Sequence, residues 1–155
     1  MDYRKIKKAD FGQLVQLWEL LIQGHTLLEP ALYKLGEGAE KKQREYFSKF
    51  VNSKDKFFMG CFDGKKLVGY VMGRVEDRPP ILTVKKMGQL SELAVLPEYR
   101  KQGVGKELSQ LFFDWCKTRG LGYVQVRVLE KNLAVSFYSK IGFKDFMKEM
   151  MLELK

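Results

Sequence analysis

The chain has 155 residues, of which 45% are hydrophobic and 13% aromatic, so a packed core is expected and disorder is excluded. Its 28 basic and 19 acidic residues give a net charge of +9, which favours an anionic partner such as nucleic acid, an anionic cofactor or an acidic substrate. No apolar run approaches the ~20 residues of a membrane span, and the first residues lack a signal-peptide pattern, so we expect one cytoplasmic domain over 1–155.

The chain begins with a short strand and an amphipathic helix. Residues Tyr3–Ile6 fit the strand. Asp10, with Gln13 three residues later, predicts a capping box at the start of a helix that ends near Gly24. Apolar residues recur along it at helical spacing and predict one packed face: Phe11, Leu14, Val15, Trp18, Leu21 and Ile22.

A second helix and a hairpin follow. Residues 25–39 carry a proline and two glycines, so a loop or broken helix is expected. A helix is predicted over 40–51. The strands 57–62 and 67–75, joined by an Asp-Gly turn, are typical of a β-hairpin.

The second half of the chain alternates strands and helices. A strand over 87–95 stops at Pro97, and a helix from Val104 ends with a glycine C-cap at Gly120. The alternation in 124–128 predicts a strand with one buried face. Asn132 then fits the N-cap of a short helix over 134–141, and residues 143–154 are expected to form one or two strands.

Cysteine and histidine are too scarce to build a metal site or a nucleophilic triad. Cys61 and Cys116 lie in apolar patterns and are expected to be buried, reduced thiols. His25 is the only histidine, which excludes a zinc cluster built on histidines and a Ser-His-Asp triad with a spare histidine. We expect no metal.

The basic, glycine-containing turn before the helix at Val104 predicts a binding site for a phosphate-type anion, because its unpaired N–H groups lie at the positive end of the helix dipole. A Walker A loop is excluded, since its first glycine is replaced by Arg100 and Lys106 is followed by Glu107. A dinucleotide fingerprint is excluded because Leu108 replaces its third glycine. From the turn alone, an ordinary strand-to-helix connection remains an alternative.

Two segments of the chain carry recognisable patterns, Arg100-x-x-Gly103-x-Gly105 and, downstream, Asn132-x-x-Ala134-x-x-Phe137-Tyr138-x-x-x-Gly142-Phe143. Together they resemble the GNAT superfamily of acetyl-CoA-dependent N-acetyltransferases, in which the first pattern is similar to the pyrophosphate loop. The order of elements outside the two segments also agrees with that family over nearly the whole chain.

The resemblance implies an α/β fold with a mixed, strongly twisted sheet of six to seven strands, splayed between the fourth and fifth, and about four helices. Acetyl-CoA would lie in the split, with its pantetheine arm along the fourth strand and its pyrophosphate on the turn. Asn132 would contact the pantetheine region, although its helix cap alone would explain it. The implied cofactor-binding residues are Leu93, Ala94, Val95, Arg100, Lys101, Gln102, Gly103, Val104, Gly105, Lys106, Asn132 and Tyr138.

The implied reaction is direct attack of a primary amine on the acetyl group in a ternary complex. Tyr138 corresponds to the family's general acid, because a phenol is protonated at neutral pH and can donate to a thiolate; a core aromatic is the alternative. Glu92 is the candidate base, and a solvated strand carboxylate is its alternative. The oxyanion donor is expected at the backbone N–H near Val95.

The partners are less well specified. The acceptor amine, chosen in this family by loops corresponding to 22–45 and 76–86, can be a small molecule, a protein N-terminus or a lysine side chain. Analogy with the fold also allows a homodimer. The main rival is an acyl-CoA binding or sensing protein without turnover. A nucleic-acid-binding domain is disfavoured, because the lysines are spread over the chain without an aromatic-plus-basic signature.

Overall fold

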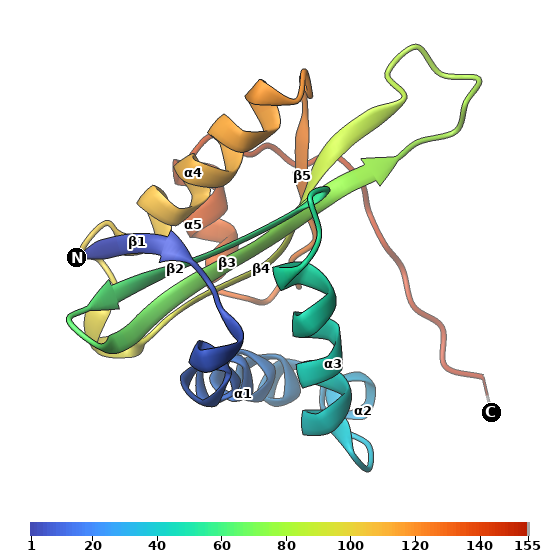
Figure 1. Cartoon of the computed structure of the whole chain (residues 1–155). Helices are drawn as coiled ribbons and strands as arrows, with labels where there is room; N and C mark the ends of the chain where they lie inside the picture. Colours follow the sequence, from blue (N-terminus) through green and yellow to red (C-terminus); the bar gives the residue numbers. More distant parts are fainter. Residues whose placement is uncertain (155) are drawn as a thin grey trace.

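The computed structural model describes residues 1–154 and shows a sheet with helices on both faces (Figure 1). Two short 3₁₀ turns, Lys8–Asp10 and Pro97–Tyr99, precede α1 and α4. The elements are β1 (Asp2–Lys5), α1 (Phe11–Leu28), α2 (Pro30–Tyr33), α3 (Ala39–Val51), β2 (Lys56–Asp63), β3 (Lys66–Asp77), β4 (Lys86–Val95), α4 (Val104–Thr118), β5 (Val124–Val126) and α5 (Ala134–Lys140).

The sheet has the order β1-β2-β3-β4-β5. Its first four strands pair antiparallel, and β5 runs parallel to β4, so the sheet is mixed as predicted. The β4-to-β5 connection contains α4, because parallel neighbours need a long crossover. Five strands lie within residues 1–154, so the expected count of six to seven is not confirmed, and five helices replace the expected four.

The missing strands belong to the C-terminal segment, residues 143–154, where the prediction of one or two strands is wrong. Beyond Phe143 this segment runs away from the body of the protein as an extended coil (Figure 1). A strand needs a neighbour to satisfy its backbone, and no backbone pairing of residues 144–154 is present within the described chain. Its large apolar side chains are 72–85% exposed: Phe146, Met147, Met150, Met151, Leu152 and Leu154.

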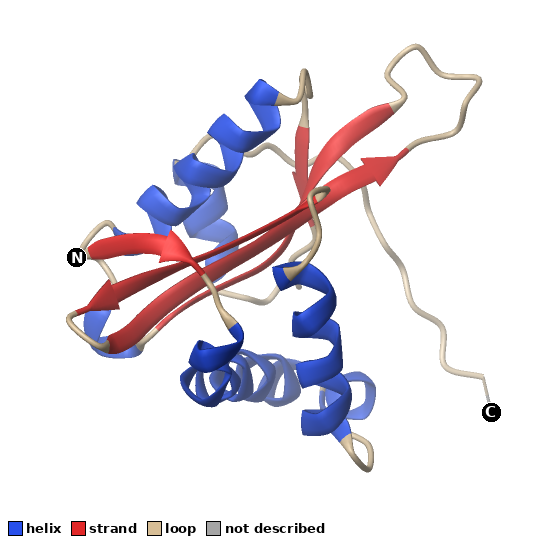
Figure 2. Ribbon diagram, viewed as in Figure 1, coloured by secondary structure: helices blue, strands red, loops and turns tan. Residues whose placement is uncertain are grey.

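The two faces of the sheet are covered by different helices. Helices α1 and α3 pack on one face and α4 and α5 on the other (Figure 2). Alternation along β3 sends Tyr70 and Met72 toward α1 and α3, and Val71 toward α4. All three side chains are fully buried, so this central strand supports both cores.

A β-bulge in β4 changes which face its side chains reach. Gly73 pairs with Leu90 and Met72 with Glu92, which leaves Ser91 as the extra residue. Leu90 therefore packs against α4, whereas Glu92, two residues later, lies on the face of Met72. Without the bulge, both would have pointed to the same face.

The first helix differs from its prediction at both ends. The expected Asp10–Gln13 capping box is wrong, because the Asp10 carboxylate accepts from Arg4 and from the N–H of Lys7, while Gln13 bonds to the hairpin backbone at Lys65 and Leu67. The helix also continues past Gly24 to Leu28. One glycine costs a helix only about 1 kcal/mol, and the stop comes from the proline that begins α2.

Candidate functional site

The strands β4 and β5 separate after three residue pairs, Gly88–Leu90 with Val124–Val126. The N–H of Leu96 donates to the carbonyl of Val68, so peptide groups alternate along β4 and those of Leu93 and Val95 face away from β3. The last five residues of β4 therefore present backbone groups that β5 does not satisfy. The predicted splay between the fourth and fifth strands is confirmed.

The turn that follows β4 exposes a run of backbone donors. Gly103 has a φ of 86° and Lys101 a φ of 61°, both in the left-handed region. Within residues 1–154, no N–H group of residues 101–106 has an acceptor, and the first bond in the run is from the N–H of Glu107 to the carbonyl of Gly103. Because α4 is 15 residues long, its dipole adds positive potential at the same point. The geometry is that of an anion site.

Side chains of the turn hold its shape. Arg100 Nε donates to the carbonyl of Val95 at 3.0 Å, and Gln102 Nε2 donates to the carbonyl of Glu98 at 2.8 Å. Both side chains therefore reach back to the protein backbone and brace the turn. The guanidinium charge of Arg100 stays exposed beside the free amides and adds to their positive potential.

Helix α5 lies against the turn. A Cβ on Gly105 would come within 3.4 Å of the Phe137 ring and 3.7 Å of the Val95 side chain. The end of β4, the start of α4 and the middle of α5 therefore meet at one place. The sequence pattern predicted this meeting from segments more than 30 residues apart.

Tyr138 follows Phe137 and is 9% exposed. Its ring contacts those of Phe137 and Phe143, with centroids 5.3 and 5.6 Å away, in the same core cluster as Leu93 and Val95. Burial raises the pKa of Tyr138 to about 12. The hydroxyl has no hydrogen-bond partner within residues 1–154, so a protonated donor is left available.

Asn132 caps α5 from outside the helix. Its Oδ1 accepts from the N–H of Ala134 at 2.9 Å, which agrees with the predicted capping role. That bond occupies one oxygen lone pair and fixes the side chain at the start of α5.

Glu92 lies on the sheet face covered by α1 and α3, opposite to Leu93. Tyr70 Oη donates to Glu92 Oε2 at 2.7 Å, and Gln43 Nε2 approaches Oε1 at 3.4 Å. Burial raises the pKa of Glu92, while these two hydrogen bonds act in the opposite direction. The carboxylate is thus held by the protein, unlike the solvated side chain that the sequence left as an alternative.

Sequence reasoning missed four polar side chains around the split. Gln43 is 49 residues from Glu92, so no local pattern could join them. Tyr70 lies in a strand of mostly apolar residues, where nothing marks its hydroxyl as part of a site. Gln89 and Gln125 occupy equivalent positions in two apolar strands, and their pairing depended on a register that the sequence does not specify.

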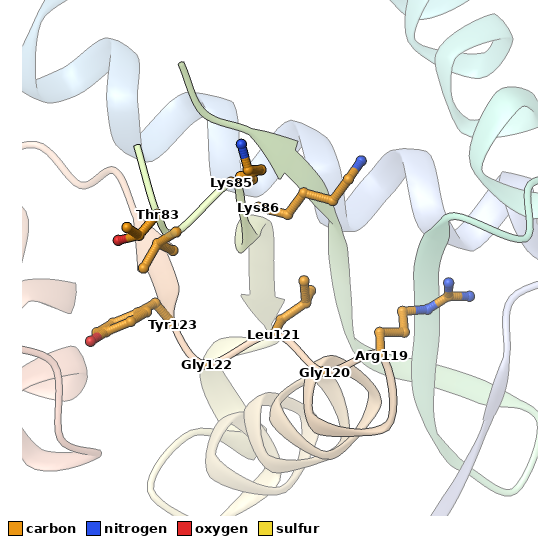
Figure 3. Close-up of a pocket in the computed structure, with 9 residues that line it drawn as sticks. Thr83, Lys85, Lys86, Arg119, Gly120, Leu121, Gly122 and Tyr123 are labelled. Atoms are coloured by element: carbon orange, nitrogen blue, oxygen red, sulfur yellow. The ribbon is translucent and has the colours of Figure 1, made fainter. Parts of the chain in front are cut away.

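A surface hollow lies at the other end of α4, between the β3–β4 loop and the connection to β5 (Figure 3). None of the predicted catalytic or cofactor-binding residues lines it, although Thr83–Lys86 belong to the loop 76–86 that was expected to choose the acceptor. Its charges are largely compensated, since Lys86 pairs with Asp77 at 2.8 Å and Arg119 with Asp55 at 3.6 Å.

Two further features concern classes of site. Among the described residues, no three His, Cys, Asp or Glu side chains gather in a way that could hold a metal ion. None of the helices in residues 1–154 combines the length and apolar character needed to cross a membrane.

Comparison with known protein families gives one match that spans most of the chain. Residues 16–143 match the model of the "Acetyltransferase (GNAT) family". The matched range includes β4, the turn, α4, β5 and α5, and so contains every residue of the site described above.

One curated relative is similar in sequence, and solved structures are similar in fold. An N-alpha-acetyltransferase of Sulfurisphaera tokodaii is 34% identical over 96 residues, which cover 57% of this chain and 56% of that protein. The chain thus spans little more than half of this relative. A mutant of BH1408 from Bacillus halodurans superposes with a TM-score of 0.90 at 19% identity over 100% of both chains. A predicted acetyltransferase with acetyl-CoA from Clostridium acetobutylicum superposes with a TM-score of 0.76 at 19% identity, over 98% of this chain and 95% of that chain.

Proposed function

Because the chain belongs to the acetyltransferase (GNAT) family, we propose that it transfers the acetyl group of acetyl-CoA to a primary amine. The observation that carries the proposal is the run of unpaired N–H groups at residues 101–106 beside the split between β4 and β5. A diphosphate needs several convergent donors at short range, and this turn offers six at a helix N-terminus.

The residues present fit acetyl-CoA along its length. The pyrophosphate would accept from the amides of 101–106, with Arg100 adding charge and Gly103 admitting the phosphate oxygens, while Gly105 leaves room for the Phe137 ring. The pantetheine amides would pair, as an added strand, with the backbone groups of Leu93 and Val95 that face away from β3, apart from the Val95 carbonyl, which accepts from Arg100. The side-chain amide of Asn132 lies at the start of α5 and would contact the same arm.

The chemistry follows from three needs of acyl transfer to an amine. Glu92, directly or through water, takes the proton from the ammonium, since only a neutral amine can attack the acetyl carbonyl. The N–H near Val95 donates to the oxyanion that forms. As the carbon–sulfur bond breaks, Tyr138 gives its phenolic proton to the departing thiolate.

A polypeptide α-amine is the acceptor to test first. The relative with 34% identity is named as an N-alpha-acetyltransferase. A free α-amine has a pKa of about 8, so a larger neutral fraction is available near pH 7 than for a lysine side chain. An amine panel should therefore contain peptides with free and blocked N-termini, a lysine side chain and an amino sugar.

The alternative is a protein that binds acyl-CoA without turnover. Thiol release from acetyl-CoA with the amine panel tests the proposal: acceptor-dependent release supports transfer, whereas tight binding without release supports the alternative. Tyr138→Phe separates them further, because it should reduce turnover much more than acetyl-CoA affinity.

A homodimer is part of the same proposal. The exposed apolar residues of the C-terminal segment form a surface that a second copy would cover. Light scattering after size exclusion, on the full chain and on a chain ending at Lys144, tests it. A mass of two chains that falls to one on truncation supports the dimer, and a single-chain mass for the full chain refutes it.

A further inference from the structure

The carboxylate of Glu92 is held at both oxygens by uncharged donors from two different elements. Tyr70, on β3, donates to Oε2 at 2.7 Å, within the short range of hydrogen bonds to charged oxygens. Gln43, on α3, reaches Oε1 at 3.4 Å. A glutamate with two donors on its two oxygens has little rotational freedom, so its direction is fixed by the fold.

The hydroxyl of Tyr70 is not needed for packing. The Tyr70 side chain is 0% exposed, and its ring makes edge contacts with Phe47 and Phe58. A phenylalanine would fill the same space. Burying a hydroxyl without a partner costs free energy, and Glu92 is the partner that this hydroxyl has within residues 1–154. The polar end of this core residue is therefore directed at one carboxylate.

The bulge at Ser91 makes this contact possible. Tyr70 pairs directly with Ala94, and Glu92, the partner of Met72, is the diagonal neighbour on the same face. If the pairing of Gly73 with Leu90 were continued without the bulge, Glu92 would pair with Val71 and its carboxylate would lie on the α4 side. The bulge in β4 and the Tyr70 hydroxyl on β3 therefore both contribute to the contact with Glu92.

Other charged and titratable groups on this face leave Glu92 without a cationic partner. Arg74, on β3, is paired with Glu76 at 3.0 Å and donates to Ser91 at 3.3 Å. Tyr46, on α3, has a pKa raised mainly by burial, with Arg74 and Glu92 acting on it in opposite directions. Helix α1 packs there through apolar side chains, and no ion pair to Glu92 exists in the described part of the chain.

Resting on the proposed function, we infer that Tyr70 and Gln43 are positioning residues that orient the Glu92 carboxylate and keep it ionised for the proton transfer from the acceptor amine. Neutral donors suit this task. They stabilise the negative charge against burial, yet they do not neutralise it, so the carboxylate can still accept a proton.

The variant Tyr70→Phe tests the inference, with Tyr3→Phe as the matched control on β1, far from Glu92 in the sheet. Burial raises the pKa of Glu92 and the hydrogen bond from Tyr70 lowers it, so removing this donor should raise the pKa. The acid limb of kcat against pH should move to higher pH, and on the acid side of the limb kcat should fall about tenfold. The KM for acetyl-CoA should stay unchanged, since Tyr70 lies on the sheet face away from α4.

Two additional measurements distinguish this role from a merely structural one. In the Glu92→Gln background, Tyr70→Phe should have no further effect on kcat, because its target is gone. Carbon-13 NMR of the Glu92 carboxyl should show a higher pKa in Tyr70→Phe and a smaller rise in Gln43→Leu. Gln43→Leu also keeps the inference testable if Tyr70→Phe fails to fold.

An unchanged Glu92 titration in folded Tyr70→Phe and Gln43→Leu would overturn the inference, and so would equal losses of kcat in the wild-type and Glu92→Gln backgrounds. The NMR titration does not depend on turnover. Failure of the wild-type protein to release thiol with any amine would instead refute the proposed function.

Discussion

Gln125 Nε2 donates to Gln89 Oε1 at 2.7 Å, across the middle of the three residue pairs that join β4 to β5. Gln89 is 6% exposed, and its own amide donates to the carbonyl of Leu90. An amide pair with one buried and one half-buried member thus lies one residue before the point where the strands separate. It fixes the depth of the split at which we place the pantetheine arm.

Breaking this pair from one side should destabilise the protein. Gln125→Ala leaves a buried carbonyl oxygen of Gln89 without a donor, which costs roughly 1–2 kcal/mol of unfolding free energy. Replacing both residues by leucine should cost less than Gln125→Ala alone, because no unpaired amide remains. Urea denaturation of the three proteins measures this, and a double variant less stable than Gln125→Ala would contradict it.

Gly103→Ala should weaken acetyl-CoA binding at least about tenfold. A side chain at a φ of 86° is strained, by roughly 1–2 kcal/mol, and the new methyl group would keep phosphate oxygens away from the amides. Gly38→Ala is the control, because Gly38 has a φ of 69° and equally open surroundings, but begins α3. Both variants should lose similar stability in thermal unfolding, and calorimetric titration should show lost affinity in Gly103→Ala alone.

Tyr138→Phe should lower kcat about a hundredfold or more while acetyl-CoA affinity changes little. Because burial raises the pKa of Tyr138 to about 12, the phenol stays protonated well above pH 10, and the wild-type kcat should not fall between pH 8 and about 10 on its account. Tyr123→Phe, at an exposed position, should behave as wild type. A kcat within about twofold of wild type in Tyr138→Phe would remove this residue from the mechanism.

Stability should depend on pH through Asp10. Hydrogen bonds from Arg4 and from the N–H of Lys7 lower the pKa of this nearly buried carboxylate. Its stabilisation is therefore complete above the unfolded pKa of about 3.9 and is lost as the pH falls through the lower folded-state pKa. Asp10→Asn should cost about 1–2 kcal/mol at pH 7, a range that allows for the partly exposed Arg4.

The pH series of denaturation curves provides the check. The two proteins should converge in stability as the pH falls below the lowered folded-state pKa of Asp10, where both side chains are neutral. Asp114→Asn, in an exposed pair three residues from Lys117, should change stability by less than about 0.5 kcal/mol at any pH. A gap between Asp10→Asn and wild type that persists at low pH would contradict the account.

Much of the fold could be predicted from sequence because its signals are local. The Asp-Gly hairpin turn and the glycine after Arg119 each depend on neighbours within a few residues, and the structure confirms them. The strand predicted from alternation over 124–128 is shorter in the structure, Val124–Val126. The turn before α4 could be predicted for the same reason, since two glycines, a proline and the start of an amphipathic helix lie within ten residues.

What the sequence could not specify depends on distant partners. From the sequence Asp10 is a typical helix cap, but in the structure Arg4 donates to both of its carboxylate oxygens. Residues 143–154 have strand-forming composition, but a strand also needs a neighbouring edge, which composition does not provide. The donors of Glu92 are Tyr70, which it meets after a bulge in β4, and Gln43 on α3, and neither contact has a sequence signal.

The central claim is that the backbone amides of residues 101–106 bind the diphosphate of acetyl-CoA. The most direct measurement is a titration followed by nitrogen-15 NMR, with acetyl-CoA and with an acetyl-pantetheine that lacks the diphosphate. The account predicts large shifts of the 101–106 amide signals with acetyl-CoA and small ones with acetyl-pantetheine. Unchanged signals in this turn, or shifts confined to the hollow near Lys86 and Arg119, would contradict it.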